Sequence, residues 1–181
     1  GRYDKDTVRG IAKELGFEVA NKPDSQEICF IPDNNYAGFI SNKLKKPAAR
    51  GKFVDIHGRV LGEHKGLIHY TVGQRKGLGL SFGKPMYVIN IDAENNNVIL
   101  GEEKDVYSES LIASDLNWIA IDSPDKPLRT NAKIRYSANE AASVITPIEG
   151  GKVRVDFDKP QRAVTPGQSV VFYDGDIVVG G

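Results

Sequence analysis

The sequence predicts a mainly β protein that ends in a small closed β-barrel, with helices only near its N-terminus. From residue 52 onward, short runs rich in β-branched and aromatic residues alternate with turn residues such as Gly, Asn and Asp. No helical spacing of apolar residues follows residue 45 or so. With 181 residues, 40% of them hydrophobic, the chain is large enough to bury a core.

Two helices are expected in the N-terminal quarter. In the first sixteen residues, apolar side chains recur at helical spacing, and Asp4 or Asp6 can cap the start. A short strand is expected at Phe17–Ala20. The second helix is expected at Tyr36–Leu44, before the breakers Pro47 and Gly51.

Strands follow. Two hairpins are expected, Phe53–Ile56 with Arg59–Gly62 and Met86–Asp92 with Val98–Gly101. Many short strands at regular spacing favour a barrel for the last ~90 residues. Its expected strands are Leu111–Ala120, Ala132–Ser137, Ser143–Ile148, Lys152–Phe157, Ser169–Tyr173 and Ile177–Val179.

Charge is distributed unevenly along the chain. The 24 Lys and Arg residues balance 24 Asp and Glu residues, yet residues 43–84 hold ten basic and two acidic ones. Such a segment faces a polyanion or forms a solvated Lys-rich surface, and composition alone leaves both open. No apolar run is long enough for a membrane helix, and a single cysteine excludes an internal disulfide. A reducing cytoplasm is therefore the expected compartment.

Cys29 is the only thiol and lies between Ile28 and Phe30. A lone Cys in an apolar run is usually an inert core residue. The polar, turn-prone residues 24–27 directly before it would instead place it at an accessible loop edge, where a sulfur chemistry could use it. The three histidines do not have a zinc spacing, so no metal site is predicted.

The most unusual stretch is Tyr70–Leu80, where glycines surround the pair Arg75-Lys76. Exposed backbone amides beside two cations suit a phosphate oxygen, and a glycine-rich hinge between domains is an equal reading. The stretch matches neither a Walker loop nor a dinucleotide-binding fingerprint.

Two further places combine residue types that bind RNA. Arg135-Tyr136 ends an expected strand and offers a cation and an aromatic face, and Gln168 offers an amide next to a Pro-Gly turn. Each alone is as readily an ordinary surface residue.

Four stretches together carry a family resemblance: Asp24–Ile31, Gly62–Leu67, His69–Gly79 and Ala163–Ser169. In this order they resemble the C-terminal half of the bacterial tRNA-specific 2-thiouridylases, once described as tRNA methyltransferases. The resemblance implies an enzyme that replaces the 2-oxygen of the wobble uridine of tRNAs for Lys, Glu and Gln by sulfur. ATP, with Mg, would adenylate that oxygen in a preceding domain, and a persulfide on Cys29 would deliver the sulfur.

The resemblance also implies an organisation. Residues 1–33 would be the helical tail of the ATP-binding catalytic domain, 34–84 a small α+β central domain, and 85–181 a barrel like the second domain of elongation factors. Arg135, Tyr136 and Gln168 would contact tRNA, and Arg75 and Lys76 its backbone. A sulfur-relay protein would be a partner, with no role for DNA or membrane. In the family a second cysteine, in the ATP-binding domain, would resolve or activate the persulfide. Neither this cysteine nor an ATP loop occurs in the 181 residues, so the chain alone is expected to bind no nucleotide and to be inactive.

Two alternatives stay open. The chain could be an RNA-binding barrel module without chemistry, in which case Cys29 would be replaceable. It could also be a module that docks a sulfur-relay protein, in which case the basic segment would bind an acidic protein.

Overall fold

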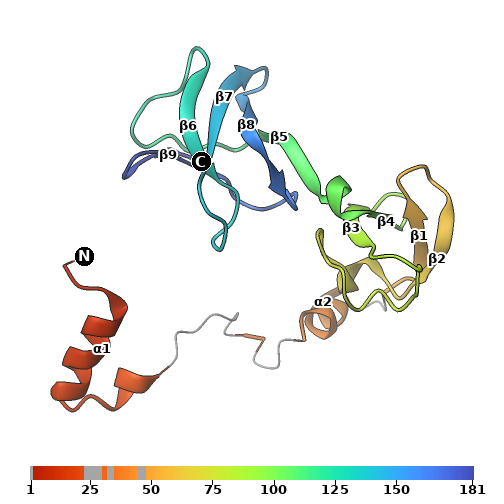
Figure 1. Ribbon diagram of the computed structural model, residues 1–181, viewed down its shortest axis with the longest axis horizontal. Coiled ribbons are helices and arrows are strands. Elements are labelled where there is room, and N and C mark those ends of the chain that lie inside the picture. Colours follow the sequence, from red (N-terminus) through yellow and green to blue (C-terminus); the bar gives the residue numbers. More distant parts are fainter. Residues whose placement is uncertain (1, 23–29, 32–34, 45–47) are drawn as a thin grey trace. The chain divides into compact units, whose positions relative to one another are not determined.

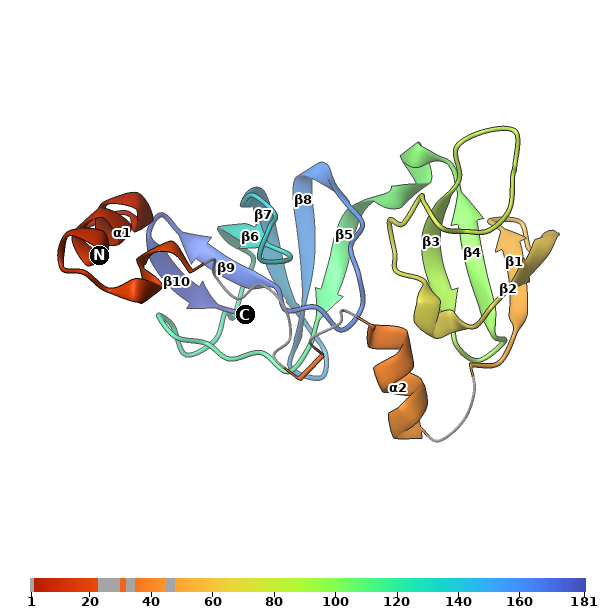
Figure 2. The same ribbon diagram turned by 90° about the horizontal axis from the view of Figure 1, so that it is seen from below.

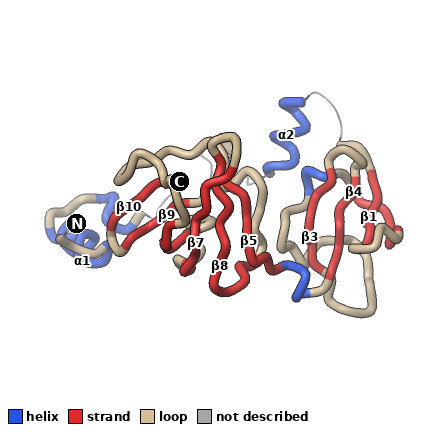
Figure 3. The backbone as a smooth tube through the Cα atoms, turned by 90° about the horizontal axis from the view of Figure 1, so that it is seen from above, coloured by secondary structure: helices blue, strands red, loops and turns tan. Residues whose placement is uncertain are grey.

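A computed structural model describes residues 2–22, 30–31, 35–44 and 48–181. The chain divides into two compact units, residues 1–47 and 48–181, and each is described by itself. The first is helical and the second is almost entirely β, which confirms the mainly β class (Figures 1 and 3). In the described ranges, the helices are all too short or too polar to cross a membrane.

The first unit contains both predicted helices. Helix α1 spans Lys5–Glu14, and the Asp4 carboxylate caps it by accepting the Thr7 N–H at 2.8 Å. Helix α2 spans Tyr36–Leu44, as expected. The short strand expected at residues 17–20 is wrong, because residues Glu18–Asn21 form the 3-10 helix η1. No described strand pairs with this segment. Local bonds hold it instead: Ala20 donates its N–H to the Phe17 carbonyl oxygen at 3.1 Å, and Lys22 donates to the Val19 carbonyl oxygen at 3.0 Å.

The second unit begins with a four-stranded sheet, ordered β2-β1-β4-β3 (Figure 2). Both predicted hairpins form within it. Strands β1 and β4, however, pair in parallel, with Lys52 opposite Asn97. The sheet therefore runs past residue 84 to Gly101, and the division into domains at residues 34–84 and 85–181 stays a prediction. The four strands are β1 (Gly51–Asp55), β2 (Val60–His64), β3 (Tyr87–Asp92) and β4 (Asn97–Gly101).

The core of this first sheet is built around Phe53, whose side chain is fully buried. The rings of His64, Tyr70 and Phe82 meet it edge to face, with centroids 5.2–6.4 Å away. A 3-10 helix, η2 (Leu67–His69), follows β2 and leads the chain to Tyr70. The ring cluster thus fixes the start of the glycine-rich stretch.

A second, six-stranded sheet has the order β10-β9-β6-β7-β8-β5. The 3-10 helix η3 (Glu103–Val106) leads into it. Four of the predicted strands are present with shifted ends. The strand predicted at Leu111–Ala120 splits into β5 and a separate segment at residues 117–120. The strand predicted at Ala132–Ser137 is mostly wrong, because β6 ends at Lys133 and the residues after it form a turn. The strands are β5 (Tyr107–Ala113), β6 (Leu128–Lys133), β7 (Ala141–Ile148), β8 (Lys152–Arg162), β9 (Val171–Asp174) and β10 (Ile177–Gly180).

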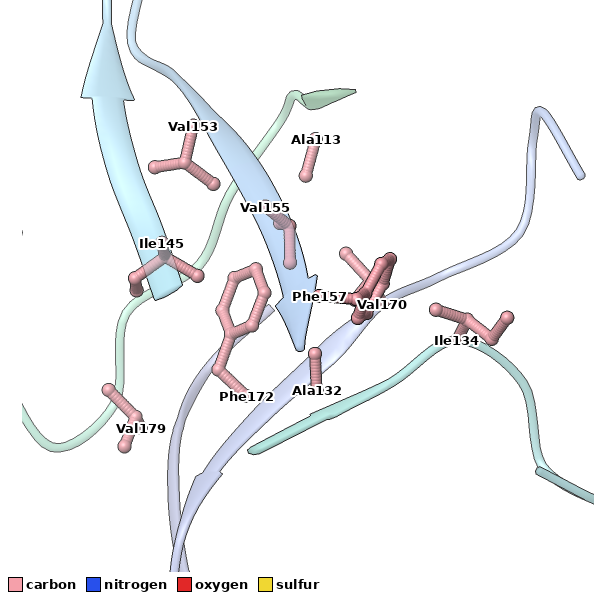
Figure 4. Close-up of a cluster of buried hydrophobic side chains, with 10 residues drawn as sticks. All are labelled: Ala113, Ala132, Ile134, Ile145, Val153, Val155, Phe157, Val170, Phe172 and Val179. Carbon is pink, nitrogen blue, oxygen red and sulfur yellow. The ribbon is translucent and has the colours of Figure 1, made fainter. Parts of the chain in front are cut away.

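Residues 117–120 close this sheet into a barrel. Asn117 exchanges two backbone hydrogen bonds with Gly181, and Ile119 donates to Val179 on β10. Because the same segment continues from β5 at the opposite end of the sheet, the two edges meet. The expected closed barrel is confirmed, with most of its core drawn in Figure 4.

Apolar side chains from all the barrel strands fill that core. Phe172, Ile145 and Val155 are completely buried, and the Trp118 ring stacks on Phe172 with centroids 5.9 Å apart. One pair of hydroxyls lies among them: the Ser143 hydroxyl donates to the Thr130 carbonyl oxygen at 3.2 Å. The barrel interior is therefore filled with side chains, and the strands packed around it hold the surface turns in place.

Candidate functional site

The glycine-rich stretch is a defined loop and not a free hinge. Gly73 donates its N–H to the Val88 carbonyl oxygen at 2.7 Å, and Val88 donates back to the Gln74 carbonyl oxygen at 2.9 Å. The Gln74 side chain ties both sides of the turn, because its Oε1 accepts from the Thr71 N–H at 3.0 Å and its Nε2 donates to the Lys76 carbonyl oxygen at 2.9 Å. Leu78 is buried in the first core.

This loop presents two cations. Arg75 and Lys76 are both exposed, and neither side chain pairs with an acidic group anywhere in the ranges that the structure describes. Arg75 borders a hollow of about 660 Å³ whose other walls are residues 77–86. Gly77, Gly79 and Gly83 in that wall all have positive φ, so the backbone turns there without side chains in the way. The arrangement can accept an extended anion.

A second surface lies on the barrel, at the turn between β6 and β7. Arg135 and Tyr136 follow the end of β6 at Lys133 by two and three residues, so they lie in a turn and do not end a strand as expected. Ala138 closes the turn by donating to the Arg135 carbonyl oxygen at 3.1 Å. The Tyr136 side chain is 94% exposed, which is unusual for a tyrosine and leaves both faces of its ring available for stacking.

Gln168 lies in the turn that precedes β9. Its N–H donates to the Thr165 carbonyl oxygen at 3.3 Å, and its side chain is exposed. The side chain of Ile134 borders two hollows, one of about 530 Å³ with Arg135 in its wall and one of about 570 Å³ with Gln168. The structure thus brings Arg135 and Gln168 to neighbouring parts of one barrel surface.

Cys29 lies outside the described residues, so its role as sulfur carrier rests on the resemblance. Among the described residues, no group of three or more His, Cys, Asp or Glu side chains is placed to hold a metal ion.

The motif around His64 has a structural use that sequence reasoning missed. The ring is 2% exposed; its Nδ1 accepts the Gly66 N–H at 3.0 Å and its Nε2 donates to the Asn96 carbonyl oxygen at 3.1 Å. Because Asn96 directly precedes β4, this histidine fastens β2 to the neighbouring end of β4. The His64 ring also packs against Gly51. A Cβ at Gly51 would lie 2.6 Å from the ring, so this position has no room for a larger residue.

Comparisons with known proteins match the whole described architecture. Residues 1–33 match a tRNA methyl transferase HUP domain, residues 37–102 a tRNA methyl transferase PRC-barrel domain, and residues 108–181 an aminomethyltransferase β-barrel domain. The middle match includes β3 and β4, in agreement with the sheet pairing.

Curated relatives match along all 181 residues. They include proteins named tRNA-specific 2-thiouridylase MnmA from Acetivibrio thermocellus, 65% identical, and from Clostridioides difficile, 55% identical. One named tRNA-specific 2-thiouridylase MnmA 2, from Caldanaerobacter subterraneus, is 61% identical. The match covers 100% of this chain and 50% of each relative, so the chain spans about half the length of the curated relatives it matches.

Proposed function

Because the chain belongs to the family of tRNA-specific 2-thiouridylases, we propose that it is the tRNA-binding and sulfur-carrying part of an enzyme that thiolates the 2-position of the wobble uridine of tRNA. One observation carries the proposal of tRNA binding. The loop that the Gln74 side chain holds in place presents two exposed cations, Arg75 and Lys76, that lack acidic partners among the described residues. The phosphate backbone of a bound RNA would supply the negative charge for these two side chains from outside.

The barrel turns supply the other kinds of contact that RNA recognition needs. Tyr136 offers an open ring on which an unpaired base can stack, and Gln168 offers an amide for a base edge. Arg135, in the same turn as Tyr136, offers a cation for a phosphate. The loop of the first sheet would then position the RNA through its phosphates, and the barrel would recognise its bases.

The sulfur-carrying role falls to Cys29, the only thiol of the chain. A persulfide sulfur is a strong nucleophile at neutral pH. A cysteine can carry such a transferable outer sulfur atom, whereas the hydroxyl of a serine cannot. A sulfur-relay protein that loads this cysteine is part of the proposal. Residues 1–33, which hold it, are proposed as the tail of the catalytic domain, followed by a central domain from residue 34.

The described residues do not fit an ATP and Mg site. The amides of Gly73 and Gln74, which begin the glycine-rich loop, already donate to Val88 and Thr71 carbonyl oxygens, and no cluster of acidic side chains in the described ranges is placed for a cation. We therefore derive no adenylation step from them and assign nucleotide binding to residues outside this chain. The chain alone should neither hydrolyse ATP nor thiolate tRNA.

The first test is the salt dependence of tRNA binding by the full-length protein. Replacing Arg75 and Lys76 together by Ala should weaken the binding of all tRNAs about equally. It should also flatten the slope of log K for tRNA binding against log salt concentration by about 1.5, because each lost phosphate contact removes about 0.7–0.9 from that slope. Filter binding at several salt concentrations measures the slope.

The matched control removes the same charge elsewhere. Lys126 and Lys152 are exposed cations of the barrel unit, outside the proposed surface, and replacing both by Ala should leave the slope nearly unchanged. An unchanged slope for the Arg75 and Lys76 variant would move the RNA surface elsewhere and favour the module that docks an acidic protein.

A different signature is expected for Tyr136. Tyr136→Ala should cost about 1–3 kcal/mol of binding free energy through lost stacking on a base, with little change in the salt slope. Tyr136→Phe is the matched control and should retain most of the affinity, since stacking needs the ring and not the hydroxyl. Equal losses for both variants would contradict a stacking role.

A further inference from the structure

Arg162, the last residue of β8, contacts both candidate binding surfaces at once. Its guanidinium Nη2 donates to the Gly73 carbonyl oxygen at 3.3 Å, two residues before Arg75. Its backbone carbonyl oxygen accepts from the Nη2 of Arg135, also at 3.3 Å. The resemblance gave this residue no role, and its contact with Gly73 joins positions 89 residues apart in the sequence.

The Arg162 guanidinium also lies over a ring. Its central carbon is 5.8 Å from the centroid of Tyr87, the buried first residue of β3. A planar guanidinium can stack on an aromatic face and donate a hydrogen bond from its edge at the same time, which an ammonium cannot do. The geometry therefore uses what is specific to arginine.

The residues around the contact between Arg162 and Gly73 are closely packed. Ala163, Val106 and Tyr87 form a small buried cluster, and Ala163 donates its N–H to the Val106 carbonyl oxygen at 2.9 Å. A Cβ at Gly73 would come within 2.8 Å of the Ala163 Cβ, so the glycine-rich loop touches the end of the barrel strand directly. Ala163 keeps a φ of 55°, a left-handed conformation that a non-glycine residue holds only where its surroundings fix it.

We propose that Arg162 is a positioning residue for tRNA binding: it ties the loop of Arg75 and Lys76 to the turn of Arg135 and Tyr136, so that the two surfaces bind one RNA as a single rigid unit. This inference rests on the proposed function. Without the tie, each surface must be ordered separately when RNA binds, and that ordering lowers the affinity.

The first experiment needs no RNA. In the 181-residue chain, amide hydrogen exchange is measured at Gly73 and Gln74, whose N–H groups donate to the Val88 and Thr71 carbonyl oxygens. The variant is Arg162→Met, which keeps an apolar stem over Tyr87 and removes the donor. The exchange should become about tenfold faster, the effect of losing one charge-assisted hydrogen bond. Arg154→Met is the matched control, because Arg154 lies on the same strand, is exposed and pairs only with Asp156 among the described residues.

Two readings of this experiment oppose the proposal. Unchanged exchange at Gly73 and Gln74 would overturn it. Faster exchange that extends to the fully buried positions Ile145 and Val155 would also overturn it, because Arg162 would then support the barrel as a whole and not the tie. Arg162→Lys should behave like Arg162→Met, since Lys cannot both stack and donate here.

The second experiment measures coupling in tRNA binding by the full-length protein. The effects of Arg75→Ala and Arg135→Ala on Kd should differ from simple multiplication by about threefold or more when Arg162 is present, and should multiply when it is replaced by Met. Coupling that survives Arg162→Met would contradict the proposal and make Arg162 a phosphate contact only.

Failure of the two ideas can be told apart. If the full-length protein binds no tRNA, the proposed function fails, while the exchange experiment still decides whether Arg162 joins the loop to the barrel. If tRNA binds with the expected salt dependence but the coupling is absent from the start, only the positioning role fails.

Discussion

Cys29→Ser in the full-length protein is expected to reduce tRNA thiolation by at least about a hundredfold, because serine cannot carry a transferable sulfur atom. tRNA binding should stay within about twofold, since the proposed binding surfaces lie at residues 75–76 and on the barrel. The thiolated nucleoside in digested tRNA, quantified by chromatography, measures the first effect, and filter binding measures the second.

The same variant tests the alternative that Cys29 is an inert core residue. Replacing a buried structural Cys by Ser typically costs only about 1–3 kcal/mol of stability, and activity would persist wherever the protein stays folded. The melting temperature of the variant is the control for folding. A thiolation rate of a tenth of normal or more would make Cys29 structural and favour an RNA-binding module without chemistry.

The largest stability effect is expected from His64→Leu. Leucine roughly preserves the volume beside Phe53 but leaves the buried Gly66 N–H without its acceptor. The Asn96 carbonyl oxygen loses the ring and keeps the Lys52 N–H at 3.3 Å. The one unsatisfied buried N–H should lower the free energy of unfolding by about 1–3 kcal/mol, measured by urea denaturation.

His57→Leu is the control, because His57 lies on the exposed turn between β1 and β2. It should change the free energy of unfolding by less than about 0.5 kcal/mol. A similarly small effect for His64→Leu would mean that the ring does not fasten β2 to the end of β4.

Local patterns predicted what depends on neighbours in sequence. The hairpins around residues 57–58 and 93–96, the helix at residues 36–44 and the closed barrel all follow from alternation and turn chemistry, and all are present. The strand predicted at residues 17–20 is wrong because a strand needs a partner strand, and a four-residue pattern does not say whether one exists.

The candidate site shows the same limit. Arg75 and Lys76 stand out in the sequence because two adjacent cations lie among glycines. Gln74 and Arg162 hold this loop in place, but the sequence does not predict their roles. Gln74 bonds Thr71 and Lys76, and Arg162 bonds Gly73; these hydrogen bonds exist only in the folded structure. The sequence likewise excludes a zinc spacing around His64 but does not predict which backbone groups its two ring nitrogens bond.

The parallel pairing of β1 with β4 also sets the order in which the molecule can form. Lys52 and Asn97 are about 45 residues apart, so closing this pair is entropically costly and slow compared with either hairpin. The loop of Arg75 and Lys76 is anchored to Val88 on β3, which joins the sheet only through β4. During synthesis the two cations emerge before Val88, and we expect the proposed anion-binding loop to become ordered only after residue 101 has been made and the sheet has closed.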